Sequence, residues 1–281
     1  NHFFSARLIM SQCAVLPAAR AFGILVHTMD IRDFDAWARQ ALDIDRFTLA
    51  DDSLNGLQVG DYEAPLRTVA FAVDAGLETI LRAQERGAQL LFVHHGLFWG
   101  KRERLTGPLF KRVGALLAAG MGLYACHLPL DAHPVLGNNA VLARLVGLEA
   151  VEPFGEYHRV LIGCKGRLAK PVSLEELQRR VLPDGSRPLS VLPFGPKAIS
   201  TVGVISGGAA EDVAQAIEQR LDAYITGETS HALYHAVREA GINMLSAGHY
   251  GTEVHGVRAV AEQACRELGL ETFFVDCPTG L

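Results

Sequence analysis

Short apolar runs alternate with segments of helical spacing from residue 68 onward. The runs are continuous and rich in β-branched residues, as in strands that are buried on both faces, and each intervening segment repeats its apolar positions every three to four residues. The strands are predicted at 68–73, 90–93 and 123–126, and the helices at 77–85, 109–119 and 139–146. This βαβαβα order predicts an α/β fold with a mostly parallel sheet covered by helices.

A second series follows the same rule nearer the C-terminus. Strands are predicted at 201–205, 223–226 and 243–247, with helices at 209–219 and 232–239. Between the two series, residues 153–196 are richer in glycine and proline. That stretch predicts a crossover with short strands and one helix over 174–181, for which Ser173 is the N-cap. An acidic turn at 30–35 predicts a further helix over 34–42.

The two series align without a gap. Thr68-Val-Ala-Phe falls on Thr201-Val-Gly-Val, and one His-x-x-x-carboxylate segment at 127–131 falls on another at 249–253. We therefore expect two similar α/β units, 29–150 and 151–281, whose C-terminal segment can pack back on the first unit. Chance convergence is the alternative, because any two βαβ units share a period. Residues 1–28 hold no acid and no clear period. They are interpreted as an extension, disordered or not native, rather than a targeting leader.

Composition narrows the class of protein. Hydrophobic residues make up 49% of the chain and the net charge is −5, which favours a packed core and argues against a nucleic-acid binder. Uninterrupted apolar stretches are too short for a membrane span. The cysteines are odd in number and widely spread, which is typical of reduced thiols in the cytoplasm. They are Cys13, Cys126, Cys164, Cys265 and Cys277.

Polar clusters follow three of the predicted strands. In parallel sheets, ligands bind beyond the carboxyl ends of the strands, so these side chains should meet at one rim. The clusters are His94-His95, His127 with Asp131, and His249 with Glu253, and Glu228 is a fourth candidate. Imidazole with carboxylate ligands suits Zn²⁺, Mn²⁺, Fe²⁺, Co²⁺ or Ni²⁺. Adjacent histidines and a bridging carboxylate favour two ions, which would acidify a bound water for hydrolysis.

Other polar residues have simpler interpretations. The pair His231 and His235 lacks the glutamate of a His-Glu-x-x-His motif and indicates an exposed helix face. The turn 206–208 is interpreted as a tight turn, with phosphate binding as the alternative. His133 is close to Asp131 and is expected to support it. No role is assigned to His2, His27, His158 and His255.

Several motifs together resemble one known family. They are Asn55-Gly-Leu-Gln-Val59, Val93-His-His-Gly96 with Phe98-Trp99, His127-Leu-Pro-Leu-Asp-Ala-His133 with Gly137-Asn-Asn139, Ile225-Thr-Gly-Glu228, and Ala247-Gly-His249 with Glu253. In this order they resemble the signatures of the GTP cyclohydrolase 1 type 2 homologues, the NIF-three-like dinuclear metal-binding proteins. The resemblance runs from Met29 to Leu281 and is to the compact form of the family.

The resemblance implies both a ligand set and an assembly. It implies two divalent ions per chain, a site-lining His127, two similar α/β units with the metal site in the cleft between them, and a toroidal homohexamer. The ligands it implies are His94, His95, Asp131, His249 and Glu253. It also implies a GTP cyclohydrolase-like activity.

Three functions remain open at the level of sequence. The first is a metal-dependent hydrolase of a small molecule such as a nucleotide, with His127 as a proton shuttle. The second is a non-catalytic protein that binds or delivers metal. The third is a ring-forming scaffold whose ions lock the assembly. The residue types select neither the metal nor the substrate.

Overall fold

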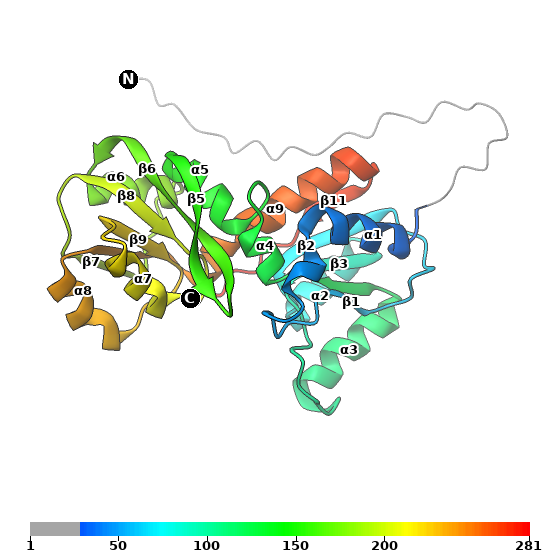
Figure 1. The fold of residues 1–281 in the computed structure, drawn as a ribbon. Coiled ribbons are helices and arrows are strands. Elements are labelled where there is room, and N and C mark those ends of the chain that lie inside the picture. The colour runs from blue at the N-terminus through cyan, green and yellow to red at the C-terminus, as the bar shows by residue number, and fades with distance from the viewer. Residues whose placement is uncertain (1–28) are drawn as a thin grey trace, which may run out of the picture.

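The computed structural model describes residues 29–281, so the predictions for residues 1–28, including His2, His27 and Cys13, lie outside it. Two β-sheets lie side by side, and each carries helices on both faces (Figure 1). Within 29–281, none of the helices has the length and apolar character needed to cross a bilayer.

The first sheet has five strands in the order β1-β4-β3-β2-β11. Its neighbours are parallel except for β1, which runs antiparallel to β4. The three predicted strands, 68–73, 90–93 and 123–126, are confirmed to within two residues at each end, whereas β1 and β11 were not predicted. The bounds are β1 Gly56–Val59, β2 Thr68–Asp74, β3 Leu90–His95, β4 Gly122–Ala125 and β11 Glu271–Phe274.

Helices bury both faces of this sheet. One face packs against α1 and α9, the other against α2 and α3. The bounds are α1 Ile31–Leu42, α2 Leu77–Glu85, α3 Gly107–Ala119 and α9 His249–Leu268. Asp30 and Asp33 form a reciprocal capping box at the start of α1, which satisfies backbone N–H groups that the helix leaves free.

The second sheet has six strands in the order β5-β6-β8-β9-β10-β7. The three strands β8, β9 and β10 are parallel, and the remaining pairings are antiparallel. The bounds are β5 Leu148–Tyr157, β6 Val160–Val172, β7 Ser190–Pro193, β8 Ile199–Val204, β9 Ala223–Thr226 and β10 Asn243–Ser246. The hairpin of β5 and β6 corrects the prediction of short strands there. Most of β5 is exposed, so its many polar residues hid the strand period.

Helices cover the second sheet as well. Helices α5 and α6 pack on one face, and α7, α8 and the 3-10 turn η2 pack on the other. The predicted helices over 209–219 and 232–239 are confirmed, each opening with a 3-10 turn, and Ser173 caps α6 as predicted. The bounds are α5 Asn138–Val146, α6 Leu174–Val181, η2 Ala210–Asp212, α7 Val213–Glu218, η3 His231–Leu233 and α8 Tyr234–Ala240.

The two sheets share a four-stranded pattern. The order β1-β4-β3-β2 in the first matches β7-β10-β9-β8 in the second, with an antiparallel edge strand in the same place. The prediction of two similar α/β units is therefore confirmed. The chain then exchanges elements between them, because α9 and β11 return to the first sheet while α5 packs on the second. The short helix α4 Leu128–Ala132 and α9, which follow β4 and β10, meet at the junction.

Candidate metal centre

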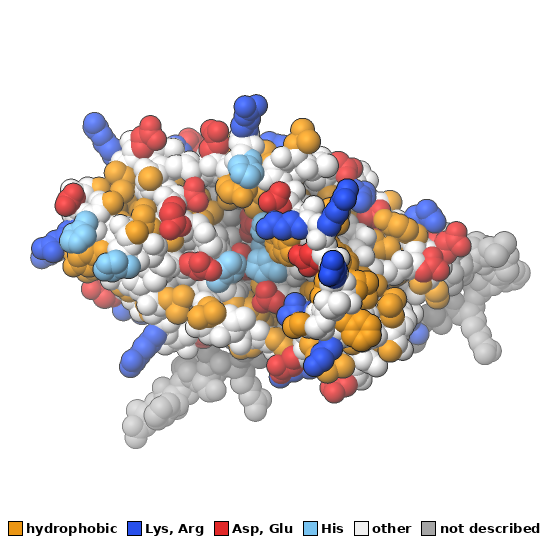
Figure 2. Space-filling view, turned by 90° about the horizontal axis from the view of Figure 1, so that it is seen from below, with side chains coloured by type: hydrophobic (Ala, Val, Ile, Leu, Met, Phe, Trp, Pro, Cys, Tyr) orange, Lys and Arg blue, Asp and Glu red, His pale blue; other side chains and the backbone are white. Residues whose placement is uncertain are grey.

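A pocket of about 640 Å³ opens at the junction and takes its lining from both units. Figure 2 shows the face of the molecule with this pocket, and histidine and acidic side chains gather in a hollow near its middle. Six of the candidate side chains from the sequence line it, while His94 lies fully buried. The six are His95, His127, Asp131, Glu228, His249 and Glu253.

Strand ends deliver these side chains. Strand β3 ends at His95, and His127 comes two residues after the end of β4 as the N-cap of α4. His249 opens α9 after β10 and the turn at Gly248. Glu253 lies four residues further along α9, and residues at that spacing share one helix face. The predicted meeting of strand ends at one rim is therefore what the fold provides.

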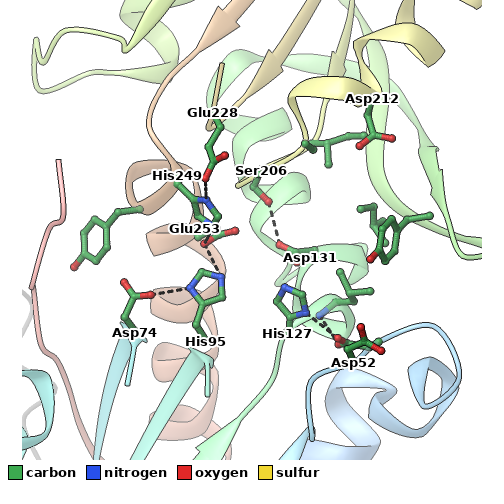
Figure 3. A pocket seen from close by; sticks show the side chains of 18 of the residues that line it. Asp52, Asp74, His95, His127, Asp131, Ser206, Asp212, Glu228, His249 and Glu253 are labelled. Carbon is green, nitrogen blue, oxygen red and sulfur yellow. Dashed lines mark hydrogen bonds and ion pairs between the residues drawn. The ribbon is translucent and has the colours of Figure 1, made fainter. Parts of the chain in front are cut away.

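Glu253 lies at the centre of the cluster, and its side chain is 4% exposed. Its Oε1 lies 3.5 Å from Nε2 of His94. Its Oε2 lies 3.2 Å from Nε2 of His95 and 3.2 Å from Nε2 of His249. One carboxylate thus faces three imidazoles from β3 and α9, of which those of His95 and His249 are drawn in Figure 3.

Asp131 approaches the same cluster from the other side. Its Oδ2 lies 3.4 Å from Nε2 of His94. Its Oδ1 accepts hydrogen bonds from Nδ2 of Asn138 at 2.9 Å and from Oγ of Ser206 at 3.0 Å. These two donors hold the carboxylate so that its second oxygen points at His94.

Every imidazole of the cluster has an oxygen at its Nδ1. Where Nδ1 carries the proton and donates to that oxygen, Nε2 keeps its lone pair, which is the arrangement found for metal-binding histidines. The Nδ1 acceptors of His94, His95, His127 and His249 are, in that order, the Cys126 carbonyl at 2.9 Å, Asp74 at 2.8 Å, Asp51 at 2.8 Å and Glu228 at 2.6 Å.

Two of these acceptors, Asp51 and Asp74, were missed in the sequence. Asp74 had a usable signal, because it directly follows the predicted strand 68–73 and lies opposite His95 in the register of β2 and β3. Asp51 had none, since it belongs to a loop that only the tertiary fold brings to His127. Glu228, the fourth candidate, orients His249.

Two atoms of the cluster lie buried without a hydrogen-bond partner, namely Nε2 of His94 and Oε2 of Glu253. Leaving a buried polar atom unsatisfied is costly, so such atoms indicate a ligand. Three groups of potential ligands have donor atoms within 4.8 Å of one another. They are His94, His95 and His127; His95, His249 and Glu253; and His94, Asp131 and Glu253. This donor set fits divalent cations.

The pKa shifts of the histidines and of Glu253 also indicate a site for positive charge. Burial lowers the pKa of His94, but Asp131 and Glu253 outweigh burial and hold it well above its ordinary value. Burial likewise lowers the pKa of His249, and Glu253 and Glu228 reverse this and raise it to about 9. Burial raises the pKa of Glu253, yet the imidazoles of His94 and His95 bring it far below its ordinary value. The site therefore stabilises positive charge, whether protons or cations.

The turn at 206–208 is a tight turn rather than a phosphate loop. The Ser206 N–H donates to Oδ1 of Asn139 and the Gly207 N–H donates to Oγ1 of Thr252. Gly207 has a φ of +66°, and a Cβ there would clash with Oε1 of Glu253. Glycine at this position therefore leaves room for the central carboxylate.

His133 corrects another expectation. Its Nε2 contacts the carbonyl of Ala41, and its Nδ1 accepts from the N–H groups of Val135 and Leu136. It therefore fixes a turn and does not support Asp131. His231 and His235 are exposed, as predicted.

Comparison with known proteins gives one family. A profile of the Duf34/NIF3 (NGG1p interacting factor 3) family matches residues 29–279. A "GTP cyclohydrolase 1 type 2 homolog" of Treponema pallidum is 42% identical over 286 residues, covering 90% of this chain and all of its own. The crystal structure of TTHA1606 from Thermus thermophilus matches with a TM-score of 0.81 at 38% sequence identity. The structure of the protein ybgI, whose function is unknown, matches with a TM-score of 0.83 at 34% sequence identity. Each covers 90% of this chain and 100% of the matched one.

Proposed function

The chain belongs to the Duf34/NIF3 family, and from that premise we propose that it is a dinuclear metal-dependent hydrolase. The observation that carries this proposal is that Nε2 of His94 and Oε2 of Glu253 lie buried without a hydrogen bond at the centre of a ring of oriented imidazoles. In a cluster that served only to stabilise the fold, these buried polar atoms would have hydrogen-bond partners.

The five ligands that the family resemblance implies divide into two overlapping sets. His95, His249 and Glu253 would hold one cation, and His94, Asp131 and Glu253 would hold the other. Glu253 is shared because its two oxygens face different imidazoles. The ligand types suit Zn²⁺, Mn²⁺, Fe²⁺, Co²⁺ or Ni²⁺. Such cations, when bound, supply a water that is acidic enough to be deprotonated near neutral pH.

His127 is proposed as the proton carrier. Oδ1 of Asp51 lies 2.8 Å from its Nδ1, which fixes the ring and leaves Nε2 towards the pocket. The ring of Trp99 packs against it at 5.0 Å between centroids, which restricts it further. An imidazole held in this way can accept a proton at Nε2 and return it to a leaving group.

Metal content tests the ligand sets. Protein purified without chelator is analysed by inductively coupled plasma mass spectrometry, and about two ions per chain are expected. His95→Ala should lower this number, whereas His235→Ala, a change at an exposed helix position, should leave it unchanged. Equal metal content in both variants, or fewer than one ion per wild-type chain even after titration, would overturn the proposal.

Turnover tests the chemistry separately. The relatives carry a name that refers to GTP, so GTP is the first substrate to assay, by formate release from the metal-loaded protein. A pocket of about 640 Å³ is in the range that small ligands occupy. His127→Gln should lower turnover about a hundredfold while the metal content stays at the wild-type level. Full metal loading with no formate would exclude the cyclohydrolase and leave metal delivery or a different hydrolysis.

A homohexamer is also proposed. Large apolar side chains on and beside α3 are exposed, among them Phe110 at 63% and Leu117 at 66%. An apolar surface of this kind favours burial against another protein surface. Light scattering after size exclusion should give six chains for the wild type and fewer for Leu117→Asp. A wild-type monomer would contradict the proposal.

A further inference from the structure

The pocket continues past the metal ligands into a region with different chemistry. Figure 3 places Asp212 on the opposite side of the pocket from Asp74, His95 and His249, with His127 and Asp131 between them. We call this region the Asp212 subsite. Its walls are Leu128, Tyr157, Ile162, Ile205, Ala209 and Asp212.

The walls of the Asp212 subsite are apolar and pre-formed. Leu128, Ile162 and Ile205 are between 1% and 7% exposed. They belong to the hydrophobic cluster that also packs η2 and α7 against the second sheet. Because these side chains are fixed by the core, the surface they present to the pocket needs no rearrangement to receive a flat apolar ring.

Tyr157 adds an aromatic wall. Its side chain lines the pocket, is 41% exposed, and stacks on the ring of His158 with 4.1 Å between centroids. The stacked His158 is held in turn, because its Nδ1 lies 3.1 Å from the carbonyl of Ala50. A supported aromatic ring at a pocket wall favours a planar ligand.

Asp212 is the polar group within this apolar setting. Its Oδ1 accepts a hydrogen bond from Nε2 of Gln215 at 2.7 Å. Within residues 29–281, its Oδ2 accepts no hydrogen bond. Burial raises the pKa of this carboxyl group, Gln215 opposes the shift, and Glu211 adds to it. The carboxylate is therefore partly desolvated, and donors on a ligand would relieve that cost.

The charge of the lining indicates which donors enter. Among the described residues, the pocket lining includes Asp51, Asp52, Asp74 and Glu228 but no lysine or arginine. An anionic group would therefore meet neither lysine nor arginine in the pocket, and the imidazole of His249 is already paired with Glu228 and Glu253. A neutral ring with N–H groups would find both an apolar wall and a carboxylate acceptor.

We propose that the Asp212 subsite binds a flat heterocycle carrying adjacent N–H donors, and that Asp212 determines specificity by accepting from them. The guanine edge, with its ring N–H beside an exocyclic amine, has this chemistry. A ring seated there would extend towards His127, so the proposal deepens the proposed hydrolase by naming its substrate class. The binding itself requires no cation.

Nucleoside binding to metal-free protein tests this independently of the metal centre. Chelator-treated protein is titrated calorimetrically with guanosine, inosine and adenosine. Guanosine should bind most tightly, and loss of the exocyclic amine in inosine should weaken binding about tenfold. Asp212→Asn should weaken guanosine binding roughly tenfold to a hundredfold and reduce its advantage over inosine. Glu211→Gln, which removes the same charge one residue away at an exposed position, should change little.

The outcomes separate the two proposals. Equal affinity of wild-type protein for the three nucleosides, or no binding of guanosine up to its solubility limit, would overturn the subsite whatever the metal content. Equal effects of Asp212→Asn and Glu211→Gln would also overturn it. Because the nucleoside series is measured on wild-type protein, the test does not depend on how the variants fold. Selective guanosine binding with no hydrolysis would support the subsite and count against the hydrolase alone.

Discussion

The segments 127–131 and 249–253 have the same His-x-x-x-carboxylate spacing but contribute differently to the cluster. Each follows the strand that lies next to the antiparallel edge strand of its sheet, β4 or β10, and each opens a helix. Each histidine is oriented by an acid from elsewhere, His127 by Asp51 and His249 by Glu228. The similarity therefore includes the support of the imidazole as well as the sequence.

The difference lies in the carboxylates. Oδ1 of Asp131 is held by Asn138 and Ser206, so only Oδ2 reaches an imidazole, that of His94. Glu253 is one methylene longer, and its two oxygens face three imidazoles. Equal spacing along the chain thus gives one carboxylate at the edge of the cluster and one at its centre, which are the proposed peripheral and shared ligands. Side-chain length and local donors decide which is which.

The largest expected effect distinguishes the two carboxylates directly. Glu253→Gln should abolish binding of both cations, because it removes the shared charge, whereas Asp131→Asn should remove about one ion per chain. Metal analysis after dialysis against trace metal measures both. If the two variants keep the same number of ions, the shared role of Glu253 is wrong.

The turn that touches both segments gives the next effect. Gly207→Ala places a methyl group against the Glu253 carboxylate and forces alanine into the left-handed region, which alone costs about 1–2 kcal/mol. We expect lower metal occupancy and lower stability in chemical denaturation. Gly208→Ala is the matched control, because its nearest contact would be an ordinary 3.6 Å. Similar losses in both variants would contradict the steric explanation.

A smaller effect is expected from changing the acids that orient the histidines, Glu228 and Asp51. Glu228→Gln should weaken metal affinity roughly ten- to a hundredfold, as is usual when the partner of a ligating histidine is changed. Asp51→Asn should affect turnover more than affinity, because His127 is proposed to move protons. Competition with a chelating dye gives the affinities. The reverse pattern would assign His127 as a ligand and His249 as the proton carrier.

The smallest effect is a pH dependence of the metal-free protein. The pKa of His249 is about 9 in the fold, against an ordinary 6.5, because Glu253 and Glu228 outweigh burial. The folded state therefore binds the proton more tightly than the unfolded state. This contribution is complete below pH 6.5 and is lost as the pH rises through 9. Thermal melts of chelated protein should fall over that window, less so in His249→Gln. A melting temperature that rises across the same window would contradict the assignment.

Hydrophobic periodicity predicted the parallel core of both units, because strands buried on two faces must be apolar throughout. It failed at β5 and β6, where exposed positions carry charges and the strand period is lost. Periodicity also placed the histidines at strand ends correctly, because the end of an apolar run can be read from the neighbouring residues alone. It misassigned His133, since proximity to Asp131 along the chain did not make the two side chains touch.

The sequence by itself therefore determined the α/β class, the doubled unit and the identity of the polar side chains that reach the rim. Only the tertiary structure decided which of them meet. Asp51 and Asp74 come to their histidines across 76 and 21 residues of chain, and α9 crosses back to the first sheet to carry Glu253 into the centre. Periodicity reports which side of an element is buried. It contains nothing about which distant loop or helix will cover that side, because packing of the whole chain fixes this.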